Sequence, residues 1–550
     1  MKKLNLKWVT DTIGEDYKKW KRGEIILLEA QTGTGKTWFI KNVLIDYLGE
    51  HERLLFVCNR TYLKRQLKID LLKKFENNKD IKIPYIKDKG KATEKIDFVA
   101  LDKITTIKNI TITTYHAIQY SARDEIYDNK KFDINLFDYI ILDECHYIMA
   151  DGSFNNKTRF AYQKLVFDQY RNIIKIFISA TMQEIKDPII RCAKKGLGKL
   201  PKVHEYSTGI DYRYLHPIYY NNDIASIINT IKNDKTDEKW LMFISDLKDG
   251  EKILKELGKN NCSLIKAGIV SDELDSIINN SKFNKKVLIA TKAMDNGINI
   301  SDTKLTNIVI MAWDRITFIQ MLGRKRILLD EPWQDVNLYI PTRMKKSFLT
   351  KLHLYDVKQA EINLLGSDQN AFDKKYDNDL RDFKDYNDIF YRSNTTGKWK
   401  VNPIGYLRLM NDVKFTKYML DKFDKDGKLA FVYEQLSWVG LEDTFDQSNL
   451  IDEVLCEEDL VTLEELIKKL IGIKVLKEDQ IKLKELLTSE AFQIDRSLLR
   501  GTKKMHPDTF NSIMERTLKL PYKVTAVKTS ERIDGQPKRY TYWVISTTEN

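Results

Sequence analysis

The sequence predicts an α/β protein with two consecutive parallel sheets, followed by a mostly helical region with a winged-helix-like end. Short apolar runs alternate with longer amphipathic stretches from about residue 24 to 180, and this alternation starts again after residue 212. It stops after about residue 345, and residues 346–440 have a mostly helical pattern. Short runs rich in Ile, Leu, Val and Phe are typical of buried parallel strands, and the stretches between them are long enough for crossover helices.

The expected strands fall into two groups. In the first unit they are EIILLEA (24–30), RLLFVCN (53–59), NITITTY (109–115), DYIILDE (138–144) and IIKIFISA (173–180). In the second unit they are KWLMFISD (239–246), CSLIKAG (262–268), KVLIATKA (286–293), NIVIMAW (307–313) and NLYIP (337–341). The polar stretch 77–109 is expected to be an insertion in the first unit.

The C-terminal third is expected to contain a linker and a small basic module. Acidic residues predict the solvated linker: Glu442, Asp443, Asp446, Asp452, Glu453, Glu457, Glu458 and Asp459. Beyond it, Thr462 and Glu465 form the pattern of a helix capping box. Residues 522–545 have the pattern of two strands around a turn at Asp534–Gly535. The expected domains are 1–208, 209–345, 346–455 and 456–550.

Composition limits the class of protein. The net charge of +12, from 91 basic and 79 acidic residues, fits a polyanion partner, although a solvated lysine-rich surface explains it equally well. The five cysteines are scattered and form no C-x-x-C pair, which argues against a zinc ribbon or a disulfide framework. No apolar run reaches the roughly 18 residues that a membrane span needs, and no apolar segment follows the N-terminal lysines. We therefore expect a cytoplasmic protein without a membrane partner.

The segment AQTGTGKT (30–37) lies between an expected strand and an expected helix, which is the context that a phosphate-binding loop requires. Glycines let the backbone amides of such a loop turn toward phosphate oxygens, the lysine reaches the β- and γ-phosphates, and the last hydroxyl ligates Mg²⁺. The segment departs from the usual pattern because Ala30 replaces the first glycine. The expected ATP ligands are Thr32, Gly33, Thr34, Gly35, Lys36 and Thr37.

The segment DYIILDECHYI (138–148) admits three interpretations. Its polar residues could be metal ligands, a Cys145–His146 nucleophile pair, or the magnesium-and-water end of a nucleotide site. A phosphate loop needs a second strand that ends in one carboxylate for Mg²⁺ and another that acts on the attacking water. We therefore assign Asp143 to Mg²⁺ and Glu144 to general base catalysis. Zinc or thiol chemistry at Cys145 and His146 lacks neighbouring partner residues.

With SAT (179–181) after the next strand, these segments resemble the DExH branch of the superfamily 2 helicases, and in particular phage, mobile-element or viral replication helicases. Further segments match the family's motifs in order: NRTYLKRQ (59–66), ITTYH (112–116), LMFISD (241–246), LIATKAMDNGINI (288–300) and QMLGRKR (320–326). The resemblance covers about residues 24–345 and implies two tandem RecA-like domains. It has two departures: Arg326 follows Arg324 by two residues rather than three, and no adenine-reading Q motif precedes Ala30.

The resemblance also implies roles for individual residues. Gln320 would contact the γ-phosphate or the attacking water, and Gly297 would contact the nucleotide. Arg324 would act across the interdomain cleft as an arginine finger, with Arg326 as a second finger. The residues expected to couple the ATP state to nucleic acid are His146, Ser179 and Thr181. The residues expected to contact backbone phosphates are Arg60, Thr114 and Thr291, although strand packing is the alternative role of the two threonines.

The function implied is that of an ATP-dependent DNA helicase or translocase that uses Mg²⁺. Lys523 and Arg532 lie among aromatic residues in the expected C-terminal ribbon, a pattern that suits nucleic acid, although aromatics packed on the preceding helices explain it equally. DNA is favoured over RNA, and the expected protein partners act in replication, recombination or defence. The alternatives are an RNA remodeller, a duplex translocase in a restriction or defence complex, and a non-catalytic nucleic-acid-binding scaffold.

Overall fold

The computed structural model consists of two compact units, Met1–Arg343 with Val357–Val454, and Met344–Asp356 with Leu455–Asn550. It describes residues 3–59, 61–76, 81–87, 94–120, 133–151, 157–168, 172–198, 201–266, 272–291, 299–327, 333–377, 388–393, 396–452, 463–494, 505–533 and 536–548. Within these ranges, no helix combines the length and the apolar character needed to cross a bilayer.

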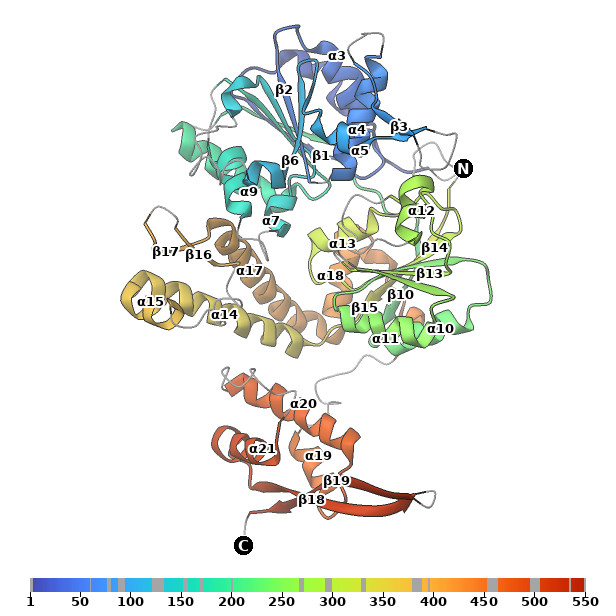
Figure 1. The fold of residues 1–550 in the computed structure, drawn as a ribbon, viewed down its shortest axis with the longest axis vertical. Helices are drawn as coiled ribbons and strands as arrows, with labels where there is room; N and C mark the ends of the chain where they lie inside the picture. Colours follow the sequence, from blue (N-terminus) through green and yellow to red (C-terminus); the bar gives the residue numbers. More distant parts are fainter. Residues whose placement is uncertain are drawn as a thin grey trace. The chain divides into compact units, whose positions relative to one another are not determined.

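The first sheet of the larger unit has seven strands in the order β5-β6-β2-β7-β8-β1-β9 (Figure 1). Its strands are β1 (Ile25–Glu29), β2 (Leu54–Cys58), β5 (Thr106–Ile107), β6 (Ile110–Thr114), β7 (Tyr139–Leu142), β8 (Ile174–Ser179) and β9 (Val203–Ser207). All pair in parallel except β5, which is antiparallel to β6. The five strands predicted in this unit are confirmed.

Helices cover both faces of this sheet because its strands are apolar on both sides. In β1, Ile26 and Leu28 belong to one apolar core, whereas Ile25 and Leu27 belong to the other. The helices are α1 (Val9–Ile13), α2 (Lys36–Phe39), α3 (Ile45–Tyr47), α4 (Thr61–Lys74), α5 (Phe98–Lys103), α7 (Tyr147–Asp151), α8 (Thr158–Tyr162) and α9 (Gln183–Leu197). Within the polar stretch 77–109, β3 (Tyr85–Lys87) and β4 (Glu94–Ile96) form a separate two-stranded sheet.

The second sheet has six parallel strands in the order β10-β15-β14-β11-β13-β12. They are β10 (Leu215–Asn221), β11 (Lys239–Phe243), β12 (Cys262–Ile265), β13 (Val287–Ala290), β14 (Leu305–Ile310) and β15 (Val336–Pro341). The accompanying helices are α10 (Ile224–Asn233), α11 (Leu247–Leu257), α12 (Asp272–Asn280) and α13 (Arg315–Leu322). Two helix-covered parallel sheets in succession confirm the predicted tandem RecA-like architecture.

The rest of the larger unit is mostly helical, as predicted. Its elements are α14 (Lys345–Ser367), which contributes residues to both units, α15 (Gln369–Asp377), β16 (Phe390–Arg392), β17 (Trp399–Val401), α17 (Pro403–Asp426) and α18 (Ala430–Trp438). The start of α17 is fixed by Asn402, whose side chain accepts a hydrogen bond from the Ile404 amide, and by Pro403 at the first helical position.

Glu442, Asp443 and Asp446 are exposed to solvent, as predicted, but residues 442–452 do not form a free linker. Ile451 N donates to Tyr220 O at 2.9 Å, so this segment is attached to the edge strand β10. Asp452 accepts hydrogen bonds from the amides of Asn222 (2.6 Å) and Asp223 (3.2 Å), just before α10. Unpaired amides at a sheet edge and before a helix explain why an acidic segment docks here. Glu453, Glu457, Glu458 and Asp459 lie outside the described residues.

The smaller unit contains the predicted C-terminal ribbon. Helices α19 (Leu463–Leu470), α20 (Lys477–Ile494) and α21 (Pro507–Ile513) precede β18 (Tyr522–Ile533) and β19 (Gln536–Thr547). The strands are antiparallel, with Tyr522 opposite Thr547. Trp543 and Tyr522 are buried in the core of this unit, so packing on the helices holds for these two aromatics. Thr462 and the Asp534–Gly535 turn lie outside the described residues.

Lys175, the second residue of β8, is a buried lysine whose charge depends on pH. Its side chain is 3% exposed, and Nζ donates to Leu165 O at 3.2 Å and to Asp168 O at 2.8 Å. Burial lowers the pKa of Lys175 to about 7.

We predict that raising the pH from 7 to 9 stabilises the wild type relative to Lys175→Met. Above pH 7 the folded state releases the Lys175 proton, whereas the unfolded chain retains it up to the ordinary lysine pKa, so stability rises with pH. The expected gain is about 2 kcal/mol, measured as the difference between the urea unfolding curves of the two proteins at each pH. A difference that stays constant with pH would contradict this assignment.

Candidate active site

The loop between β1 and α2 makes its sharp turns at two glycines. Gly33 and Gly35 have φ angles of 94° and 83°, which other residues rarely adopt. A Cβ atom on Gly33 would lie 2.7 Å from the carbonyl oxygen of Ile327, so only glycine fits there. Ala30 is fully buried at the end of β1, and its amide donates to Ser179 O at 3.1 Å. The loop therefore accommodates alanine where the usual pattern has glycine.

The three threonines of the loop differ in burial and in hydrogen bonding. Thr34 is buried, and its hydroxyl donates to Gln31 O at 2.7 Å, so this side chain holds the loop together. Thr37 is exposed at the start of α2. Thr32 is half-buried, and a Cβ atom added to Gly323 would lie 2.8 Å from the Thr32 hydroxyl oxygen. Thr37 is thus available to a metal ion, and Thr32 faces the second sheet.

Glu144 and Lys36 form an ion pair between the end of β7 and the loop, with 2.8 Å between Nζ and Oε1. Asp143 N donates to Val57 O, and Cys145 N donates to Ile178 O, so the turn after β7 stays attached to both neighbouring strands. Glu144 has a φ of 50°, which is uncommon for a residue other than glycine. This left-handed backbone accompanies the approach of the Glu144 carboxylate to Lys36.

The two adjacent carboxyl groups have opposite pKa shifts. Burial and the negative charge of Glu144 raise the pKa of Asp143. Burial alone would also raise the pKa of Glu144, but the positive charges of Lys36, His146 and Arg324 outweigh it and hold this pKa low. A cation beside Asp143 would relieve the cost of its ionisation, which is the chemistry expected of a Mg²⁺ ligand.

Cys145 and His146 do not form a nucleophile pair. Burial and the two carboxylates raise the pKa of the Cys145 thiol well above its ordinary value, so it stays protonated and inert.

His146 Nδ1 lies 3.0 Å from Ser179 Oγ and 3.4 Å from Glu144 Oε2. Ser179 Oγ in turn lies 3.2 Å from Thr181 Oγ1. The three residues predicted to couple the sites are therefore contiguous with Glu144. Within the described ranges, no group of three or more His, Cys, Asp or Glu residues is placed to hold a metal ion.

The segment that follows α13 in the second domain lies against the loop, and its arginines are close enough to the two carboxylates for their charges to interact. Arg324 follows α13, is 9% exposed, and its Nη2 donates to Gln320 Oε1 at 3.2 Å. Burial and the charge of Arg324 lower the pKa of Arg326 to about 10, although Glu144 and Asp143 oppose the shift. Backbone hydrogen bonds from Ile300 N to Arg324 O and from Arg326 N to Ile300 O fix this segment. The short GRKR spacing thus brings both arginines near the carboxylates.

Two buried polar atoms at this point test whether a nucleotide fits. Glu144 Oε2 and Arg324 Nε are buried and make no hydrogen bond within the described part of the chain, although His146 Nδ1 lies 3.4 Å from Glu144 Oε2. Buried polar groups normally have partners. A γ-phosphate and the water that attacks it would supply an acceptor for Arg324 and a donor for Glu144. Together with Lys36 and the Gly33 turn, these atoms fit a nucleoside triphosphate.

The structure gives less support to the residues predicted to contact nucleic acid than to those predicted to bind ATP. The Thr114 hydroxyl accepts a hydrogen bond from Ala117 N at 3.1 Å, so it caps the helical turn that follows β6. Thr291 follows β13 and is half-buried. Lys523 is exposed on β18. Arg60 and Gly297 lie outside the described residues, as does the side chain of Arg532.

Sequence reasoning missed the segment that supports the loop from outside. Val9 N donates to Thr34 O at 2.9 Å, and the Trp8 ring lies 3.0 Å from the position that a Cβ atom on Gly35 would occupy. Gln31 exchanges two hydrogen bonds with the backbone of Asp211, at 2.9 and 2.8 Å. The sequence signal for this segment was weak, because Trp8 is one of several apolar residues scattered among polar ones near the N-terminus.

Comparisons with known proteins agree with this geometry. The family model "Type III restriction enzyme, res subunit" matches residues 4–184, and "Helicase conserved C-terminal domain" matches residues 222–326. These ranges correspond to the first and second sheets.

A curated relative is "Putative helicase 22" of Sulfolobus islandicus filamentous virus (isolate Iceland/Hveragerdi). It is 24% identical over an alignment of 352 residues, and the match covers 54% of this chain and 57% of the relative. The chain thus spans less than two thirds of that relative's length.

Solved structures that resemble the chain include S. cerevisiae Dbp5 bound to RNA and ADP BeF3, with 15% identity, 58% of this chain and 78% of that chain covered, and a TM-score of 0.39. Another is Mycobacterium smegmatis helicase Lhr bound to ssDNA and AMP-PNP, with 11% identity, 73% and 59% covered, and a TM-score of 0.40. The two family-model matches lie within residues 4–326, in the order of the two parallel sheets, and support a superfamily 2 helicase core in this part of the chain.

Proposed function

We propose that this protein is an ATP-dependent DNA helicase or translocase of the DExH type, which hydrolyses ATP between its two sheets in order to move along or unwind nucleic acid. The observation that carries the proposal is the convergence of Lys36 and Glu144 with Arg324 and Arg326. Two of these residues belong to the first domain and two to the second. Hydrolysis that needs all four depends on the relative position of the two domains.

The Lys36–Glu144 pair provides a switchable base. Lys36 would turn its ammonium group toward the β- and γ-phosphates when ATP binds. Glu144 then loses its strongest positive neighbour, so burial raises its pKa toward neutrality and makes it a better proton acceptor. Its oxygen Oε2 is the atom that accepts a proton from the attacking water.

Thr37 and Asp143 would hold Mg²⁺. The bound ion neutralises charge on the phosphates. Thr37 is exposed, and Asp143 lies beside the Lys36–Glu144 pair, so both can face a triphosphate in the loop. Arg324 and Arg326 place positive charge where negative charge develops on the transferred phosphoryl group. Gln320 orients Arg324 through their hydrogen bond.

DNA is the proposed polyanion because the chain lacks a Q motif, has the short GRKR motif and ends in a basic ribbon. The exposed Lys523 of β18 suits a phosphate contact. A second candidate is translocation on duplex DNA without unwinding, within a restriction or defence complex. The match of residues 4–184 to a restriction-enzyme subunit model favours that candidate.

We predict that Lys36→Ala and Glu144→Gln separate binding from hydrolysis. Lys36→Ala removes the phosphate contact and should weaken binding of a fluorescent ATP analogue about tenfold or more. Glu144→Gln keeps the shape of the side chain but cannot accept the proton, so hydrolysis should fall by about 100-fold or more while binding is retained. Steady-state ATPase and analogue titration check both changes. A Glu144→Gln protein as active as the wild type would contradict the role of this base.

The nucleic-acid preference is tested with the same ATPase assay in the presence of ssDNA, duplex DNA, ssRNA or duplex RNA. Strong stimulation by ssDNA, lost in Lys36→Ala, is the expected result. Stimulation by duplex DNA without strand separation selects the translocase, and stimulation by RNA alone selects an RNA remodeller. Absence of ATPase activity under every condition would overturn the motor proposal in favour of a scaffold.

We also predict that Mg²⁺ activates the enzyme less effectively at low pH. The pKa of Asp143 is raised to about 6, so lowering the pH from 7.5 to 5.5 protonates this carboxyl group and removes a metal ligand. The free Mg²⁺ concentration that gives half-maximal activity should rise several-fold. ATPase rates measured against calculated free Mg²⁺, which accounts for protonation of ATP itself, test this. Equal half-maximal values at both pH values would exclude Asp143 as the titrating ligand.

A further inference from the structure

Helix α13, which carries Gln320 and precedes Arg324, is held at its first turn by the other domain. Arg315 Nη1 donates to Glu184 Oε1 at 2.5 Å, and Glu184 lies in the first turn of α9, shortly after Thr181. Both side chains are less than a quarter exposed, at 22% and 24%. Limited exposure makes an ion pair less screened than one at the surface. The first domain therefore contacts α13 directly through this ion pair.

The N-cap residue of α13 also pairs with a residue of the accessory helix α17. Asp314 is the N-cap, and its Oδ1 and Oδ2 accept hydrogen bonds from Thr317 N at 3.0 Å and Thr317 Oγ1 at 2.9 Å. Arg408 of α17 places Nη2 at 3.3 Å from Asp314 Oδ2, and its Nε donates to Asp412 at 2.9 Å. Arg408 is only 13% exposed in this pairing. A residue of the accessory helices therefore contacts the helix of the arginine finger.

The first turns of α17 are anchored on the first domain. Ile404 is fully buried in the apolar core that covers one face of the first sheet, and Leu407 packs against the same core. Arg408 follows one turn later. Its position is thereby set by the domain that holds Lys36 and Glu144.

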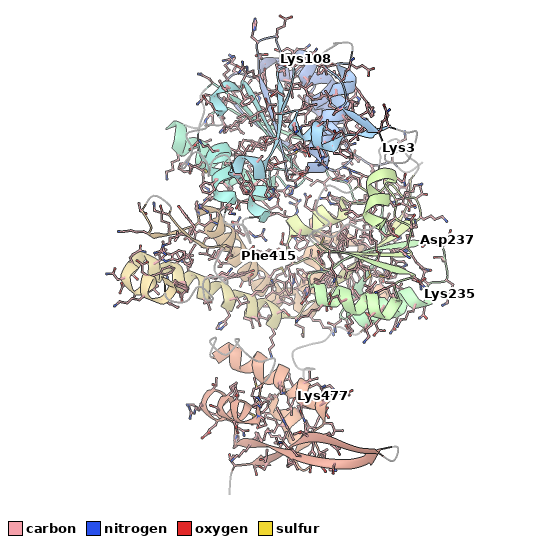
Figure 2. All side chains as sticks on the ribbon, viewed as in Figure 1. Lys3, Lys108, Lys235, Asp237, Phe415 and Lys477 are labelled. Carbon is pink, nitrogen blue, oxygen red and sulfur yellow. The ribbon has the colours of Figure 1, made fainter. Side chains whose placement is uncertain are left out.

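Helices α17 and α18 form a helical hairpin, and the second half of this hairpin is anchored on the second domain. Phe415, which is labelled in Figure 2, belongs to α17. Its ring packs against Trp438 of α18, with ring centroids 6.1 Å apart. Trp438 also contacts Phe318 of α13, at 5.3 Å between centroids. Gln435 Nε2 donates to Pro341 O, at the end of β15, at 2.8 Å. The α17–α18 hairpin therefore touches both motor domains and α13 itself.

We propose that Arg408 is a positioning residue for ATP hydrolysis: by pairing with Asp314 it lets the α17–α18 hairpin set the place of α13, and so of Arg324, against Glu144. This inference rests on the proposed ATPase function. The eight residues of α13 form a rigid rod about 12 Å long, so a shift at Asp314 is transmitted to the finger at its other end. Misplacement by about 1 Å is enough to slow a positioned reaction strongly.

The test compares Arg408→Gln, Asp314→Asn and the double variant. Asparagine caps a helix as well as aspartate does, so Asp314→Asn removes the charge but keeps the start of α13. Each single variant should lower kcat for nucleic-acid-stimulated ATP hydrolysis about five- to tenfold, with KM for ATP within about twofold. The double variant should be no slower than the slower single variant, because both changes break one interaction. Arg408→Lys, which keeps the charge, should recover part of the loss.

The matched control is Lys358→Gln. It breaks a 2.7 Å ion pair with Asp388 in the same helical region and should leave kcat unchanged. Wild-type kcat in both Arg408→Gln and Asp314→Asn, or losses that multiply in the double variant, would overturn the inference. An equal loss in Lys358→Gln would also overturn it, because the effect would then be general destabilisation.

A second readout does not depend on turnover. Hydrogen exchange at the amides of α13, measured with a non-hydrolysable ATP analogue, should be faster in Arg408→Gln than in the wild type. If the wild type hydrolyses no ATP, the proposed function fails, and the exchange rates alone decide whether Arg408 positions α13. Unchanged exchange would overturn the inference. If Arg408→Gln unfolds at a lower temperature, Asp314→Asn gives the decisive comparison.

Discussion

The structure depends on placing opposite charges together in a site that is largely withdrawn from water. Glu144 and Lys36 are 21% and 13% exposed, and neither charge would be stable there alone. Their pairing joins the end of β7 to the loop after β1, and the arginines from the second sheet add two further positive charges. Lys36, Arg324 and Arg326 together carry more positive charge than the two carboxylates can neutralise. A triphosphate would neutralise the remainder. The same need for charge compensation ties the second domain to the first.

This arrangement explains why the domains must act together. Arg324 belongs to the second sheet but is buried near carboxylates of the first, and Arg315 pairs with Glu184 across the same boundary. A movement that separates the sheets would leave Glu144 with fewer positive neighbours and Glu184 without its partner. In the proposed mechanism, ATP and the α17–α18 hairpin would act on one equilibrium, the approach of α13 to the first domain. Nucleic acid that binds one domain arrangement better than another would shift the same equilibrium.

The sequence was sufficient for the central strands because these are apolar on both faces and bounded by polar residues. The strands it did not predict lie at sheet edges: β9 is polar and half-buried, and β10 contains Pro217, which an edge strand tolerates. The Lys36 and Glu144 positions were predictable because local motifs specify them. Trp8, Glu184 and Arg408 were not, since their contacts join residues far apart in the chain. Thr114 fits the family's motif, yet its hydroxyl caps the following helical turn, which a motif alone cannot reveal.

In the proposed mechanism the second domain completes the active site by supplying Arg324. Single-turnover hydrolysis by Arg324→Ala, with ATP binding measured in parallel, tests this role. An arginine finger contributes roughly 10³-fold or more to hydrolysis, so we expect a loss of about that size with binding nearly intact. Hydrolysis at the wild-type rate would show that the first domain acts without the second.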